Sequence, residues 1–195
     1  MDQRRRLLLA SSSPYRKELL GRLGLAFEVA APGIDEAALA NEAPADTALR
    51  LSIEKAASLQ ARYGDYLIIG SDQVASCGGA RYDKPGDHAH ALRQLRSLSG
   101  KTADFHTAVS LLDASSGAVQ SRVVPCRVTF RKLSDALIEA YLRREQPYDT
   151  AASAKAEGLG IALIARVETD DPTSLIGLPL IALSEMLERA GQPVL

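Results

Sequence analysis

The stretch Tyr66-Leu-Ile-Ile-Gly-Ser-Asp72 gives the clearest indication of the fold class. It is a continuous apolar run that ends in polar residues, the pattern of a strand buried on both faces. Leu7 to Ala10 has the character of another short buried strand, and Ala26 to Ala31 of one that ends at Pro32-Gly33. The fold class then depends on which elements alternate with these strands along the chain.

Helices are expected between these strands because capping residues precede apolar faces. Ser13 is expected to cap a helix with Pro14 in its first turn, and Gly24 to stop it. Asp46 is expected to cap a long helix through about Arg62, with an apolar stripe of Leu49, Ile53, Ala56 and Leu59.

The second half mixes helices with a β-hairpin. Asp87 caps a predicted helix that ends before Gly100, Ser134 caps another to about Glu145, and a last helix covers Leu180 to Ala190. The predicted strands are Phe105 to Leu112, Ser121 to Phe130 and Gly160 to Val167. Turn residues at 113–117 join the first two into the hairpin. The alternation predicts an α/β fold with a mixed sheet and flanking helices.

The composition is that of one globular domain over residues 1–195. The 195 residues carry 23 Lys+Arg against 24 Asp+Glu, and a long polyanion as main partner normally requires a basic excess. The basic clusters at 4–6 and 143–144 are short, so no nucleic-acid partner is expected. Cys77 and Cys126 form no metal-ligand pattern and fit a reduced, cytoplasmic protein. The apolar run after the first arginines is too short for a signal sequence, and no stretch has the length of a membrane span.

The turn at Ala10-Ser-Ser-Ser-Pro-Tyr-Arg-Lys17 has the ingredients of an anion site. Three hydroxyls and two cations crowd a predicted helix N-terminus, whose N–H groups and dipole favour negative charge. The segment lacks the glycines of a P-loop. The alternative is a capped surface helix with solvated basic residues.

Several carboxylates and lysines complete the candidate chemistry. Asp72 is expected at the carboxyl end of a buried strand, where open α/β sheets place ligands, and could hold a divalent cation or act as a base. Its alternative role is that of a turn residue. Glu36, Lys55 and Lys84 are dispersed, and each alone fits a solvated charge, so only the fold could bring them together.

These segments together resemble the Maf nucleotide pyrophosphatases. The resemblance starts at 10–17 and continues through Ile34-Asp-Glu36, Glu54-Lys-Ala56, Ile69-Gly-Ser-Asp-Gln73 and Lys84-Pro85, ending at Gly177-Leu-Pro-Leu180. It implies a twisted mixed sheet in two lobes around a central cleft, as in Maf and ITPase-like proteins. It also implies hydrolysis of a nucleoside triphosphate to the monophosphate and pyrophosphate with a divalent metal, Mg²⁺, Mn²⁺ or Co²⁺. Homodimers are common in the family, so a homodimer is an expected assembly.

The resemblance also assigns roles residue by residue. Asp72 would be the catalytic carboxylate that accepts a proton from the attacking water, and Glu36 and Asp72 would hold the metal. The residues implied to act on the triphosphate are Lys55, Lys84 and Arg16, with Ser11 and Ser13 at the helix start. Cations and metal would stabilise the charge that grows on the leaving pyrophosphate.

Two positions bear on the choice of base. Many members that cleave dTTP and UTP have Arg after the Ser-Pro, where this chain has Tyr15, and Gln in the segment where it has Glu157. At both positions the chain resembles the branch of the family that hydrolyses 7-methyl-GTP and so removes modified nucleotides. An aromatic face attracts the cationic 7-methylguanine by about 0.5–2 kcal/mol, and a carboxylate can accept from its N1–H and amine. Gln73 would complete the pocket. The alternative is a tolerated surface exchange.

The chain departs from the family's sequence pattern at two positions, and two other functions are alternatives. Ala152 stands where the family often has Gly, and Thr150 follows Asp149 in place of Lys. The alternatives to 7-methyl-GTP are dTTP, UTP or modified pyrimidine nucleotides as substrates. A further alternative is a non-catalytic nucleotide-binding regulator of cell division.

Overall fold

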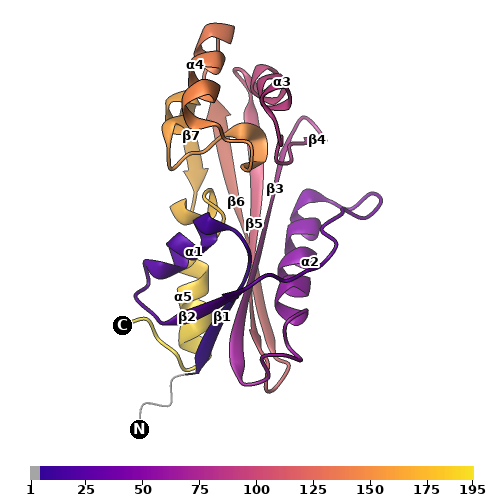
Figure 1. The fold of residues 1–195 in the computed structure, drawn as a ribbon, viewed down its shortest axis with the longest axis vertical. Coiled ribbons are helices and arrows are strands. Elements are labelled where there is room, and N and C mark those ends of the chain that lie inside the picture. Colours follow the sequence, from indigo (N-terminus) through magenta and orange to yellow (C-terminus); the bar gives the residue numbers. More distant parts are fainter. Residues whose placement is uncertain (1–4) are drawn as a thin grey trace. The chain divides into compact units, whose positions relative to one another are not determined.

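A computed structural model describes residues 5–195, so Arg4 of the first basic cluster lies outside the described residues (Figure 1). Within this range the α-helices are α1 (Pro14–Gly21), α2 (Pro44–Ala57), α3 (His88–Leu98), α4 (Asp135–Glu145) and α5 (Leu180–Arg189). The strands are β1 (Arg6–Ala10), β2 (Phe27–Ala30), β3 (Tyr66–Cys77), β4 (Ala80–Arg81), β5 (Thr102–Asp113), β6 (Val119–Phe130) and β7 (Ile164–Thr169). Short 3-10 helices cover Ala151–Ser153, Leu159–Leu163 and Pro172–Ser174.

The described strands form one seven-stranded sheet in the order β2-β1-β3-β5-β6-β7, with β4 paired to β3. β1 runs parallel to both β2 and β3, whereas the β3–β4 and β6–β7 pairs are antiparallel. The predicted α/β class with a mixed sheet is therefore confirmed.

The chain divides into two compact units. The first comprises residues up to Asp72 together with Thr107–Val124 and Asp171–Leu195, and the second comprises Gln73–His106 and Pro125–Asp170. Strands β3, β5 and β6 each begin in one unit and end in the other.

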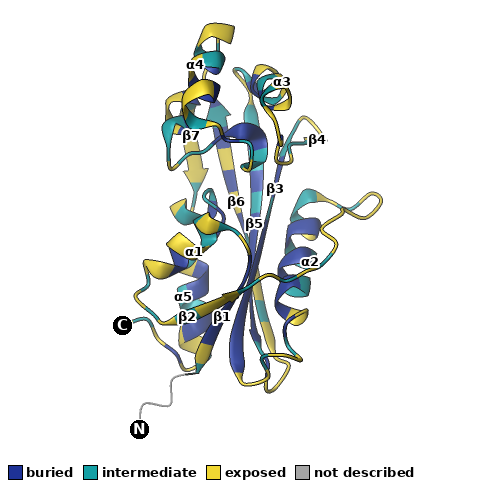
Figure 2. Cartoon of the chain, in the orientation of Figure 1, coloured by how far each residue is buried: buried dark blue, intermediate teal, exposed yellow. Residues whose placement is uncertain are grey.

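The first unit is built around β1, which alternates its side chains between two hydrophobic clusters. Leu7 and Leu9 pack with residues of α1 and α5, and Leu8 and Ala10 pack with Ala56 of α2 and with Leu59, which follows that helix. Figure 1 shows α1 and α5 on one side of these strands and α2 on the other. Both faces of β1 and β3 are accordingly buried (Figure 2), as their unbroken apolar runs predict.

Three predicted helix boundaries in this unit are wrong. Helix α2 begins at Pro44 with Ala43 at its N-cap, so Asp46 lies inside the first turn, and the helix ends at Ala57. A proline in the first turn needs no N–H partner and has a φ suited to a helix, which explains the earlier start. Helix α1 ends at Gly21, three residues before Gly24. The predicted cap of α1 is confirmed, since the Ser13 side chain accepts from the Arg16 N–H.

The buried face of α2 also differs from the predicted stripe. The residues that it buries are Thr47, Ala48, Leu51, Ser52, Lys55 and Ala56. Leu49 and Ile53 are only partly buried, so the helix is rotated relative to the prediction. Two polar residues, Ser52 and Lys55, consequently face the protein interior.

The second unit contains α3, α4, β4, β7 and the ends of the long strands. Asp87 and Ser134 cap α3 and α4 as predicted, accepting from the N–H groups of His90 and Leu137. The strand predicted over Gly160 to Val167 is wrong in its first half, because Leu159–Leu163 forms a 3-10 helix and β7 begins at Ile164. None of the helices in residues 5–195 is both long and apolar enough to cross a bilayer.

Candidate active site

Strand β3 carries the residues around which the site is built, and it continues well past them. The prediction that Asp72 ends the strand is wrong, because β3 extends to Cys77. Ser71 is fully buried, and its hydroxyl lies 2.7 Å from the Ala108 carbonyl oxygen and 2.9 Å from that of Gly177. These distant partners satisfy a polar side chain inside the strand, where the sequence alone suggested its end.

Gly70 lets α2 lie directly against β3. A Cβ on Gly70 would overlap the Ser52 carbonyl oxygen, so only glycine permits this approach of helix to strand. Lys55 follows Ser52 by three residues and therefore lies on the same face of α2. The close contact is what brings the Lys55 side chain to the strand.

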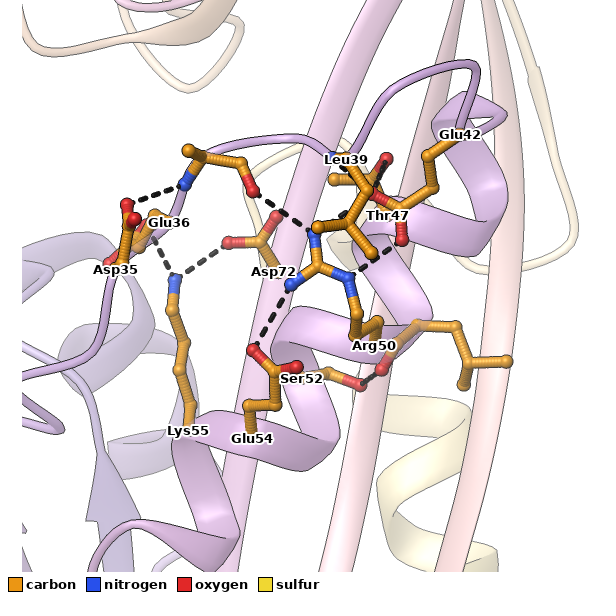
Figure 3. Close-up of polar contacts among 12 residues, drawn as sticks. Asp35, Glu36, Leu39, Glu42, Thr47, Arg50, Ser52, Glu54, Lys55 and Asp72 are labelled. Atoms are coloured by element: carbon orange, nitrogen blue, oxygen red, sulfur yellow. Dashed lines mark hydrogen bonds and ion pairs between the residues drawn. The ribbon is translucent and has the colours of Figure 1, made fainter.

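The Lys55 ammonium binds two carboxylates in the interior. Its Nζ donates to Asp72 Oδ1 at 2.6 Å and to Glu36 Oε2 at 2.8 Å (Figure 3). The Lys55 side chain is 3% exposed and that of Asp72 9%, whereas that of Glu36 is 57% exposed. The structure thus brings two of the dispersed residues, Glu36 and Lys55, together with Asp72, and the expectation of a solvated Lys55 is wrong. The two carboxylates replace the water that burial removes from the Lys55 ammonium.

The loop that carries Glu36 is held on α2 by Arg50. The Arg50 guanidinium donates to Glu42 at 2.7 and 2.8 Å, to Glu54 at 3.1 Å and to the Ala37 carbonyl at 3.1 Å (Figure 3). Its hydrogen bonds lower the pKa of Glu42 to about 2. No sequence pattern indicates the Arg50–Glu42 pair, whereas the four-residue spacing of Arg50 and Glu54 on one helix face is a signal for the contact between those two residues.

Arg16 adds a cation near the two carboxylates. Its Nε donates to the Gly177 carbonyl at 2.9 Å, which fixes the start of α1 against the Gly177 loop. Burial lowers the pKa of Arg16, while the charges of Asp72 and Glu36 act in the opposite direction. Arg16 therefore lies within electrostatic range of both carboxylates.

The hydroxyls before α1 already accept from its backbone. Ser11 Oγ accepts from the Ser13 N–H at 3.1 Å, and Ser13 Oγ accepts from the Arg16 N–H at 3.4 Å. Ser11 is buried, whereas Ser13 and Tyr15 are half-buried in the loop and first turn. These residues lie in the first unit together with Arg16.

The three remaining candidate residues lie in the second unit. Gln73 follows Asp72 in β3 and is half-buried. Lys84 is exposed in the loop between β4 and α3, and Glu157 is exposed between two 3-10 helices. Ala152, where the family often has Gly, has a φ of 57°, so the family's glycine fits the left-handed backbone there.

The carboxylates of Glu36 and Asp72 fit a metal ion only if a bound substrate supplies further oxygen atoms. Among residues 5–195 no group of three or more His, Cys, Asp or Glu side chains could hold a metal ion. Glu36 and Asp72 each contact Lys55 through a single oxygen. Two carboxylates completed by substrate oxygens are a common way to bind Mg²⁺, so the residues fit such an ion.

The chain is similar over nearly its whole length to several proteins that share one name. A "7-methyl-GTP pyrophosphatase" from Cupriavidus pinatubonensis is 59% identical over 96% of this chain and 94% of its own length. Proteins of the same name from Cupriavidus metallidurans and Thiobacillus denitrificans are 57% and 55% identical, over 98% and 97% of this chain and 96% and 94% of their own. The family model described as Maf-like protein matches residues 6–190. The chain belongs to the Maf family.

One solved structure shows a weaker likeness. The structure of a HAM1 protein from Coxiella burnetii superposes with a TM-score of 0.45 and 13% sequence identity, covering 67% of this chain and 75% of the other.

Proposed function

We propose that this protein hydrolyses 7-methyl-GTP to 7-methyl-GMP and pyrophosphate, and so removes a modified nucleotide from the cytoplasmic pool. The observation that carries the proposal is the buried Lys55 between Asp72 and Glu36. It occurs in a chain whose relatives, 55% to 59% identical over nearly their full length, are named for this activity.

Asp72 is the proposed base. Hydrolysis at the α-phosphorus needs a group that takes a proton from the attacking water, and a carboxylate held in its ionised form can do so. Lys55 holds the Asp72 carboxylate in place through a 2.6 Å ion pair, at a position where the Asp72 side chain is only 9% exposed. Asp72 would also hold a divalent cation, together with the carboxylate of the largely exposed Glu36.

The cationic side chains would bind the triphosphate. Arg16 and Lys84 would contact its oxygens together with Ser11 and Ser13, and Lys55 would offset charge at the reacting end. When a divalent ion is bound, it neutralises part of the charge on the leaving pyrophosphate. Arg16 is suited to this role because its guanidinium is fixed by Gly177 and lies near both carboxylates.

Tyr15, Glu157 and Gln73 are proposed to select the base. Methylation at N7 leaves guanine positively charged, so an aromatic face and a carboxylate both attract it.

We further propose that residues 1–195 act as one catalytic domain. Its substrates would be free nucleotides rather than nucleic acid, and its proposed assembly is a homodimer.

A panel of nucleotides tests this function. We expect the highest kcat/KM for 7-methyl-GTP when 7-methyl-GTP, GTP, dTTP and UTP are compared with Mg²⁺, Mn²⁺ or Co²⁺. Faster cleavage of dTTP or UTP would reject the assigned base. Stoichiometric binding with no pyrophosphate release would instead support a non-catalytic regulator. Asp72→Asn is expected to lower kcat by about 10²–10⁴-fold while the protein stays folded, and full activity in that variant would remove Asp72 from the mechanism.

A further inference from the structure

A tight turn in the second unit carries Glu157. The Lys155 carbonyl oxygen accepts from the N–H groups of both Gly158 and Gly160, each at 3.0 Å. The chain therefore folds back on itself between Lys155 and Gly160, with the exposed Glu157 inside the turn. The position of Glu157 depends on what holds the two ends of this turn.

One carboxylate contacts both ends. Glu145, the last residue of α4, has Oε1 at 2.9 Å from Lys155 Nζ, and its Oε2 accepts from the Leu159 N–H at 2.7 Å. The Glu145 side chain is only 11% exposed. Gly158 lies so close that a Cβ there would be 2.7 Å from Glu145 Oε2. The carboxylate is thus enclosed by the turn, and its charge-assisted bonds are stronger than neutral ones.

Helix α4 holds the preceding segment as well. Tyr141, one helical turn before Glu145, is buried and donates its hydroxyl to the Ser153 carbonyl at 3.0 Å. The same hydroxyl accepts from the Lys155 N–H at 3.0 Å. The backbone from Ser153 to Leu159 is therefore fixed to α4 by contacts to Tyr141 and Glu145.

We propose that Glu145 is a positioning residue for base selection: by binding both ends of the Lys155–Gly160 turn, it holds Glu157 in place for the purine. This inference rests on the proposed function, in which Glu157 accepts from the base. Glu145 itself contacts no reacting atom. Its loss should therefore change the choice of base more than the rate of phosphate chemistry.

The test compares 7-methyl-GTP with UTP, which carry the same triphosphate. Their ratio of kcat/KM isolates recognition of the base. Glu145→Gln removes the charge and keeps an oxygen for the Leu159 N–H. We expect this ratio to fall about tenfold, through a higher KM for 7-methyl-GTP, with little change in kcat. Lys155→Met, which removes one of the two contacts of Glu145 with the turn, should lower it in the same direction and serves if Glu145→Gln does not fold.

Asp135→Asn is the matched control. Asp135 lies at the start of the same helix and pairs with Arg96 at 2.8 Å on the surface, where both side chains are at least half exposed. Breaking this pair should leave the ratio unchanged. An equal fall with the control would mean that the fall reflects a general loss of α4 stability, and would overturn the proposal.

A second variant separates positioning from structure. Glu157→Gln should lower the ratio, and adding Glu145→Gln should lower it no further, because both changes act through one side chain. A further fall in the double variant, or an equal loss of kcat on both nucleotides, would overturn the role of Glu145. Failure of the proposed function is seen separately, in the parent protein, as no preference for 7-methyl-GTP.

Discussion

Replacing Lys55 by Met probes the buried cluster most directly. The change removes the ammonium that lies 2.6 Å from Asp72 and 2.8 Å from Glu36, and keeps an apolar stem of similar length. Removing one partner of a buried pair costs about 3–5 kcal/mol. Glu36, at 57% exposure, can return to water, whereas Asp72 at 9% cannot. We therefore expect a loss near the lower limit, about 3 kcal/mol.

The double variant Lys55→Met/Asp72→Asn should recover part of this stability. It leaves no stranded charge, only an amide whose unmet hydrogen bond costs about 1 kcal/mol. The coupling energy between the two sites is this recovered stability plus the cost of Asp72→Asn alone, so it should be at least about 2 kcal/mol. Urea unfolding of the four proteins measures it, provided that all share one slope of free energy against urea.

The pair between Glu18 of α1 and Arg22 at the C-cap of that helix is a matched control. Its atoms lie 3.1 Å apart, but the side chains are 49% and 71% exposed. A helix-surface pair of this kind should couple by only about 0.3–0.5 kcal/mol. If the Lys55–Asp72 coupling is no larger than this control, the two groups are not a desolvated ion pair and the reasoning fails.

Three further predictions follow from the packing. Gly70→Ala should cost about 1–3 kcal/mol in urea unfolding and lower kcat by displacing α2, whereas Gly64→Ala, with open space around it, should stay within about 0.5 kcal/mol of the parent. Because the pKa of Glu42 falls from 4.5 to about 2 on folding, its stabilising effect is complete above pH 4.5 and is lost as the pH drops toward 2. The difference in free energy of unfolding between the parent and Glu42→Gln should therefore shrink as the pH falls over that range. A difference that does not change with pH would contradict the lowered pKa of Glu42. Burial raises the pKa of Cys126 to about 11, so iodoacetamide at pH 8 should label the half-buried Cys77 first and both thiols only in urea, and equal native rates would refute it.

Local features of the fold could be predicted from the sequence, because they depend on neighbours in the chain. The caps at Ser13, Asp87 and Ser134 each accept from an N–H three residues on. The buried character of β1 follows from its apolar run. Such signals need no knowledge of distant residues.

The burial of charge could not be predicted in this way. Ser71 and Asp72 look like the end of a strand, yet β3 continues because distant groups satisfy them. The sequence around Lys55 is that of a solvated lysine. Lys55 is buried because Gly70 has no side chain and so allows α2, which carries Lys55, to lie against β3. Partners more than ten residues away decide both cases, and no local pattern encodes them.

The bond that is cleaved in 7-methyl-GTP tests the central claim most directly. Hydrolysis in ¹⁸O-water, followed by mass spectrometry of the products, reports both the turnover and the atom attacked. We predict equal amounts of 7-methyl-GMP and pyrophosphate, with the label in 7-methyl-GMP. Release of 7-methyl-GDP and phosphate, label in pyrophosphate, or binding with no products would contradict it.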